Sequence, residues 1–108
     1  MKHEVSNRGD HVVVALKGEV DLESSPEARE LLLTSVAADR NVLVDLSAVT
    51  YIDSSGVASL VEALQASRKK GTQFALAAAS EPARRVLELA RLDRVFTMHD
   101  TVEDALNA

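Results

Sequence analysis

The residues of this chain best suited to chemistry are two serines at the start of a predicted helix, in the motif Asp53-Ser54-Ser55-Gly56. A helix N-terminus presents free backbone N–H groups and a partial positive charge, so it stabilises an anion. Phosphorylation of a serine there would add a charge of about −1.5 to −2. The helix dipole would tolerate that charge, but a protein packed on the helix tip would lose its fit. The motif therefore predicts a switch that acts on binding rather than on folding.

The same motif also has a simpler interpretation as a helix cap. Ser and Asp at a helix start are most often caps, which contribute about 1 kcal/mol, and residue types alone do not distinguish Ser54 from Ser55. We expect Asp53 to be the N-cap, and it would also be placed to orient the Ser54 hydroxyl or to contact a kinase. Gly56 is expected to leave the helix surface bare, so that the backbone of another protein can approach closely.

The helix that carries this motif is predicted over residues 54–70, and Gly71 provides its left-handed stop. Its apolar stripe has the spacing of a core-facing surface and consists of Val57, Leu60, Val61 and Leu64. The opposite face carries small or charged residues, which would form a low surface for a partner: Ser55, Ala58, Ser59 and Glu62.

The remaining elements alternate between strands and helices after an opening hairpin. Strands are predicted at residues 3–7, 12–18, 41–46, 73–77 and 94–98, with a loop at residues 47–53. Two helix starts are marked by a serine cap and a proline, in Ser24-Ser25-Pro26 and Ser80-Glu81-Pro82, and Asp100 is expected to cap a last helical segment. This order predicts an α/β fold with a small mixed sheet, with helices on one face or on both.

The composition is that of a single domain spanning residues 1–108, with 46% hydrophobic residues and an aliphatic core. A net charge of −5 disfavours direct binding of nucleic acid. The chain has no cysteine, and His3, His11 and His99 lack metal-ligand spacing, so no metal site is expected. No apolar run approaches the roughly 20 residues that cross a bilayer. We expect a cytoplasmic protein with no secretory signal and no membrane insertion.

The central segment resembles a known family. The string DLSAVTYIDSSGV, residues 45–57, is similar to the pattern of anti-sigma factor antagonists of the STAS domain family, in which a strand ending in Asp-Leu precedes a loop and Asp-Ser-Ser/Thr-Gly. The likeness extends over nearly the whole chain. Supporting matches are Gly18-Glu19-Val20-Asp21, Lys70-Gly71-Thr72 and residues 84–96, RRVLELARLDRVF.

The resemblance implies a STAS-type fold with about four helices packed mainly on one face of the sheet. It implies that Ser54 is the serine that a partner kinase phosphorylates. In the unphosphorylated form such proteins bind an anti-sigma factor that is also a serine kinase, which frees a sigma factor to activate transcription, and a serine phosphatase resets them. The resemblance places Asp21 near this serine, although Asp21 is equally well explained as a turn residue. ATP and magnesium belong to the kinase, so no cofactor is expected on this chain.

Two other functional classes compete with this one. A STAS subunit or regulatory module of another assembly, such as a lipid-transport ABC complex, would need no phosphorylation switch, but those subunits tend to lose the full Asp-Ser-Ser-Gly pattern. An enzyme using Ser54 as a nucleophile would need a base and an oxyanion hole, and no G-x-S-x-G motif is present. We therefore expect a binding protein and not an enzyme.

The chain departs from the family pattern at two places. Val57 replaces the more usual leucine, which puts nothing serious in doubt. No glycine stands near Ala90-Arg91, where the family often has one, so the third helix is expected to end differently.

Overall fold

The computed structural model describes all 108 residues. The strands are β1 (Lys2–Arg8), β2 (His11–Val20), β3 (Asn41–Ile52), β4 (Phe74–Ala77) and β5 (Thr97–His99). The helices are α1 (Ser25–Ala37), α2 (Ser54–Lys70), α3 (Glu81–Leu89) and α4 (Val102–Leu106), and a 3-10 turn spans Leu92–Arg94. None of the helices combines the length and the apolar character needed to span a bilayer.

The strands form one mixed sheet in the order β1-β2-β3-β4-β5. β1 pairs with β2 in the antiparallel sense, whereas β2, β3, β4 and β5 run parallel to one another. The tight turn between β1 and β2 contains Gly9 at a φ of 61°, a backbone conformation that glycine adopts without steric cost. Because β2 and β3 are parallel neighbours, the segments that follow them emerge at the same edge of the sheet.

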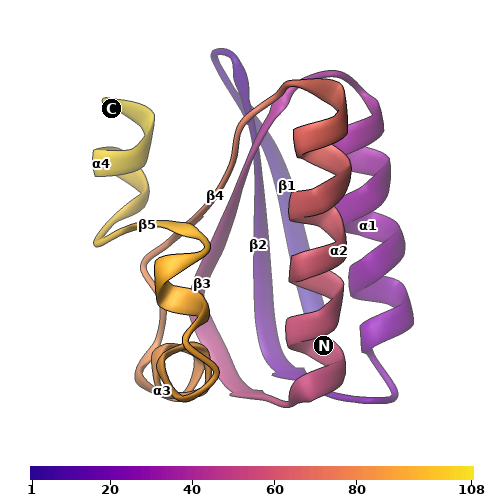
Figure 1. The fold of residues 1–108 in the computed structure, drawn as a ribbon, viewed down its shortest axis with the longest axis vertical. Coiled ribbons are helices and arrows are strands. Elements are labelled where there is room, and N and C mark those ends of the chain that lie inside the picture. The colour runs from indigo at the N-terminus through magenta and orange to yellow at the C-terminus, as the bar shows by residue number, and fades with distance from the viewer.

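Three of the four helices, α1, α2 and α3, pack on one face of this sheet. The main core contains 21 buried residues, to which β2, β3, α1, α2 and α3 all contribute. The opposite face carries a small cluster of Val13, Leu43, Ala77 and Ala105, the last of which belongs to α4. Figure 1 shows α1 and α2 side by side along the sheet, with α4 on the other side. This arrangement confirms the predicted mixed sheet with its helices mainly on one face.

The prediction of a loop at residues 47–53 is wrong, because β3 continues to Ile52. β2 also runs past Gly18 to Val20, and the two extensions pair with each other through Gly18↔Val49 and Val20↔Ile52. The register is irregular between Ala15 and Lys17 and between Gly18 and Glu19. These irregularities interrupt the alternation of buried and exposed side chains by which a strand is predicted from sequence. As a result, the sheet itself carries the chain to within two residues of Ser54.

The C-terminal third also differs in detail. α4 is capped by Thr101, whose hydroxyl accepts a hydrogen bond from Asp104 N at 3.0 Å, and not by Asp100. The last strand is shorter than the predicted 94–98, because the 3-10 turn occupies Leu92–Arg94. The expectation that the third helix ends differently from the family stays a prediction. α3 ends at Leu89. Arg91 follows it in the left-handed region at a φ of 59°, a conformation that costs a residue with a side chain roughly 1 kcal/mol.

Candidate functional site

The first turn of α2 is held by the Asp53 carboxylate. Asp53 Oδ1 accepts hydrogen bonds from Ser55 N at 3.0 Å, from Gly56 N at 3.3 Å and from the Ser55 hydroxyl at 2.5 Å. The hydrogen bond from the Ser55 hydroxyl is the main reason why the pKa of Asp53 lies below its usual value, and the two backbone N–H groups add to it. This confirms Asp53 as the N-cap of α2 and keeps its carboxylate ionised.

The two serines of the motif differ in their surroundings. The Ser55 side chain is half-buried, and its hydroxyl is bonded to Asp53. Ser54, the first residue of α2, is exposed, and its hydroxyl forms no hydrogen bond with the rest of the chain. Only Ser54 therefore offers a free hydroxyl at this helix tip, a distinction that residue types alone did not provide.

The expectation that Gly56 leaves a bare outer surface is wrong. Gly56 is buried, and a Cβ built on it would lie 2.7 Å from the carbonyl oxygen of Val20 and 2.8 Å from Cγ1 of Ile52. A real Cβ does not come this close to a backbone oxygen, so the glycine allows α2 to start tightly against the ends of β2 and β3. Its small size serves a contact inside the domain.

Asp21 organises the loop between β2 and α1. Its Oδ1 accepts from Glu23 N and Ser24 N, both at 3.1 Å, and the Ser24 N–H is the main cause that lowers the pKa of Asp21. The nearby charge of Asp53 acts in the opposite direction and raises the pKa of Asp21. Asp53 N also donates to the carbonyl oxygen of Val20 at 3.3 Å. The structure thus places Asp21 in a turn and brings it to the same end of the sheet as Asp53.

The expected capping role of the Ser24 side chain is not observed. Ser24 occupies the N-cap position of α1, but its hydroxyl bonds back into the loop, where it accepts from Asp21 N at 2.9 Å and lies 3.0 Å from the carbonyl oxygen of Glu19. This side chain therefore stabilises the turn rather than the helix.

A groove of about 610 Å³ runs between α1 and α2. All four residues predicted opposite the apolar stripe of α2 line it: Ser55, Ala58, Ser59 and Glu62. Ser25, Pro26 and Arg29 are among the residues that α1 contributes. The α1 side was missed, because no local pattern indicates which residues of another helix face a given stripe.

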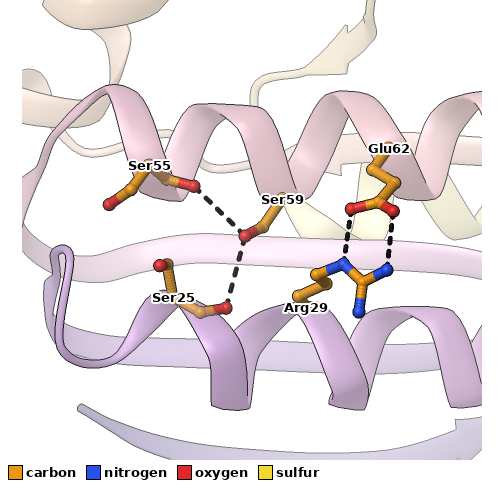
Figure 2. Close-up of polar contacts among 5 residues, drawn as sticks. All are labelled: Ser25, Arg29, Ser55, Ser59 and Glu62. Carbon is orange, nitrogen blue, oxygen red and sulfur yellow. Dashed lines mark hydrogen bonds and ion pairs between the residues drawn. The ribbon is translucent and has the colours of Figure 1, made fainter.

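Ser59 lies at the bottom of this groove rather than on an open surface. It is only 4% exposed, and its hydroxyl lies 3.3 Å from the carbonyl oxygen of Ser25 and 3.2 Å from that of Ser55. Figure 2 shows Ser59 between these two groups, which belong to different helices. The expectation of an exposed Ser59 is wrong, because α1 packs across this part of α2.

An ion pair joins the two helices farther along the groove. Arg29 of α1 donates through Nε and one terminal nitrogen to the two carboxylate oxygens of Glu62, at 2.6 and 2.8 Å (Figure 2). These hydrogen bonds hold the pKa of Glu62 below its usual value. Both side chains are about half exposed, so solvent screens the pair and its contribution to stability is small. Its geometry fixes the Glu62 carboxylate at one wall of the groove.

No group of three or more His, Cys, Asp or Glu side chains is arranged to hold a metal ion. The start of α2 offers the free hydroxyl of Ser54, the ionised carboxylate of Asp53 and a helix N-terminus. These groups suit modification and recognition by another protein.

Comparison with known proteins identifies the family. Residues 2–105 match the model of the STAS domain. Similar proteins include the anti-sigma-B factor antagonist of Listeria monocytogenes, 28% identical over 99 residues, which cover 91% of this chain and 86% of the relative. The anti-sigma-F factor antagonist RsfB of Mycobacterium tuberculosis is 30% identical over 103 residues, which cover 94% of this chain and 84% of the relative.

Solved structures share the fold as well. An anti-sigma factor antagonist from Mycobacterium paratuberculosis superimposes with a TM-score of 0.90 at 30% identity, covering 98% of this chain and 91% of that one. The match spans the sheet, the helices and the segment that leads into α2. This chain belongs to the STAS domain family.

Proposed function

We propose that this chain is an anti-sigma factor antagonist whose binding is switched by phosphorylation of Ser54. In its unphosphorylated form it binds an anti-sigma factor that is also a serine kinase, and a sigma factor is thereby freed to activate transcription. Relatives that carry the antagonist name, at 28% and 30% identity over most of the chain, support this role. The observation that carries the switch is the exposed hydroxyl of Ser54, which no other group of the chain engages.

A kinase must reach the hydroxyl that it phosphorylates and must deprotonate it as the phosphoryl group arrives. Ser54 meets the first requirement, since it is exposed at the first position of α2. Ser55 is less accessible, because its side chain is half-buried and its hydroxyl is donated to Asp53. The difference in burial and bonding supports Ser54 as the acceptor.

A phosphate on Ser54 would meet opposing forces. The positive end of the α2 dipole favours an anion, whereas the ionised carboxylates of Asp53 and Asp21 at the same end repel it. Neither force requires the core to rearrange, because Ser54 contributes nothing to it. The modification would therefore change the charge and the shape of the surface while the fold persists.

The partners of this proposal are those that the resemblance to anti-sigma factor antagonists implies. The anti-sigma factor supplies the kinase activity with its ATP and magnesium, and a serine phosphatase removes the phosphate. Both act in the cytoplasm, where sigma factors work. The chain itself acts by binding and not by catalysis, which is supported by the lack of any base bonded to the Ser54 hydroxyl.

The test measures affinity for each anti-sigma factor with a serine-kinase domain that the source organism encodes, purified individually. We expect wild type and Ser54→Ala to bind one of them equally. Ser54→Asp should bind that factor at least about tenfold more weakly, which corresponds to roughly 1.4 kcal/mol.

The matched control is Gln65→Asp, which places the same charge on an exposed position of α2 away from its start. It should bind like wild type. Equal binding by Ser54→Ala, Ser54→Asp and Gln65→Asp would remove the switch from this account.

A further inference from the structure

One large apolar side chain stands out beside the switch serine. Leu22, in the loop between β2 and α1, is 75% exposed. Four other large hydrophobic residues are also exposed, namely Val5, Tyr51, Leu89 and Val95. A single exposed leucine is ordinary on a protein surface, so its significance depends on how it is held and on what surrounds it.

The loop that carries Leu22 is fixed from both sides. On its C-terminal side, Asp21 Oδ1 accepts from Glu23 N and Ser24 N, and the Ser25 N–H donates to the carbonyl oxygen of Asp21 at 2.8 Å. The backbone N–H of Leu22 itself lies close enough to the Asp53 carboxylate to lower the pKa of Asp53. Leu22 is thus an exposed side chain on a backbone already ordered, and a partner that buries it pays little additional backbone entropy.

The surroundings of Leu22 are acidic, and no cation of the chain compensates them. Four acidic residues lie around it, and none of them takes part in any ion pair of the structure. They are Glu19, Asp21, Glu23 and Asp53. The six ion pairs of the chain use six different acidic residues. A surface that leaves these carboxylates unpaired is complementary to a basic partner surface.

We propose that Leu22 is the apolar anchor of the antagonist's contact with its anti-sigma factor, received by an apolar pocket that basic side chains surround. This inference rests on the proposed function and adds to it the residue and the kind of surface that set partner choice. The arrangement of one buried apolar anchor within a polar rim is the usual architecture of a binding hot spot. Leu22 lies beside the Ser54 surface, because the strand end that precedes its loop pairs with the one that precedes Ser54, through Val20↔Ile52 and the hydrogen bond from Asp53 N to the carbonyl oxygen of Val20.

The anchor and the switch then have separate effects. Phosphate on Ser54 controls whether the surface fits, whereas Leu22 determines how tightly the unmodified surface binds and how well the kinase captures its substrate. Replacement of Leu22 should therefore raise the KM for phosphorylation of Ser54 and leave kcat nearly unchanged. A merely structural role of Leu22 would lower thermal stability instead.

The test compares Leu22→Ala with Leu89→Ala, since Leu89 is 80% exposed on α3 and provides a matched control. Both variants are titrated against the purified anti-sigma factor that binds wild type. We expect Leu22→Ala to weaken affinity at least tenfold and Leu22→Lys to weaken it further, with unchanged thermal unfolding. Leu89→Ala should bind like wild type.

The outcomes separate this inference from the proposed function. If wild type and Leu89→Ala bind the factor and Leu22→Ala binds within twofold of them, the anchor is refuted while the antagonist role stands. If wild type binds none of the purified anti-sigma factors, the proposed function itself fails. Affinity of wild type should also fall as salt is raised, and an affinity independent of salt would contradict the basic partner surface.

Discussion

Two strand ends of this domain are built alike and differ in one respect. β2 ends at Val20 and β3 at Ile52, and these residues are paired in the sheet. Each is followed by an aspartate whose Oδ1 accepts from the backbone N–H groups two and three residues further on. For Asp21 the donors are Glu23 and Ser24; for Asp53 they are Ser55 and Gly56.

The difference lies in what happens to the serines that follow. After Asp21, the Ser24 hydroxyl bonds into the turn and Ser25 is buried. After Asp53, the Ser55 hydroxyl bonds to the cap, but Ser54 remains exposed and unbonded. The difference shows that an Asp-and-serine turn at a helix start is mainly structural, and that a hydroxyl is available for modification where the turn's hydrogen bonds leave it out.

The largest expected effect comes from forcing these two strand ends apart. Gly56→Ala would place a Cβ against the carbonyl oxygen of Val20 and the Ile52 side chain. Overpacking of this kind costs about 1–3 kcal/mol, and each kcal/mol lowers the Tm of a domain of this size by about 4–8 °C. Thermal unfolding followed by circular dichroism checks this.

The control for this substitution is Ala58→Ser, which changes an exposed position two residues away. It should lower the Tm much less than Gly56→Ala does, since serine is only slightly poorer than alanine as a helix former. A Gly56→Ala variant as stable as wild type would mean that the start of α2 tolerates separation from β2, contrary to the packing described above.

A smaller effect is expected from the two capping carboxylates, and it depends on pH. The folded-state pKa values of Asp21 and Asp53 are both lowered, by hydrogen bonds that favour the ionised form. Their stabilisation is therefore present above the unfolded pKa of about 3.9 and is lost as pH falls through the folded values. Asp53→Asn and Asp21→Asn should each unfold at a lower temperature than wild type at neutral pH, and this difference should shrink below about pH 4.

The double variant sharpens the comparison. Since the charges of Asp21 and Asp53 repel each other, each single substitution also relieves this repulsion, so removing both should cost more than the sum of the two single substitutions. Unfolding temperatures measured across pH for all four proteins provide the check. Differences that persist unchanged in acid would show that the carboxylate charges do not stabilise these turns.

The smallest effect is expected for Ser54 itself. Ser54→Ala removes a hydroxyl that bonds to nothing in the chain, so stability should change by less than about 0.5 kcal/mol. Ser24→Ala, at the equivalent turn, should destabilise the domain more, because its hydroxyl accepts from Asp21 N. Denaturant unfolding of both variants ranks them, and a reversed order would break the distinction between the two turns.

Local sequence signals predicted those features of the site that depend on neighbouring residues. The range of α2, its cap at Asp53 and its left-handed stop at Gly71 agree with the structure, because each is determined by a few adjacent residues. The same reasoning failed for Gly56 and Ser59. Their surroundings come from Val20 on β2 and Ser25 on α1, which lie more than 30 residues away in the sequence.

The strand extension at residues 47–52 was missed for a related reason. This part of β3 is stabilised by its register with Lys17–Val20 of β2, and the irregular register hides the alternation expected of a strand. The motif alone also did not separate Ser54 from Ser55. That distinction required the hydrogen bond from Ser55 to Asp53, which only the folded geometry shows.

The most direct test of the central claim is to map the phosphate after wild type is incubated with ATP and the anti-sigma kinase that binds it. Peptide mass spectrometry distinguishes Ser54 from Ser55 and from Ser24 and Ser25 at the other turn. We predict a single phosphate, on Ser54, and no labelling of Ser54→Ala. Phosphate on Ser55, Ser24 or Ser25 in wild type, or labelling of Ser54→Ala equal to that of wild type, would contradict the claim that the one hydroxyl left free by the two turns is the switch.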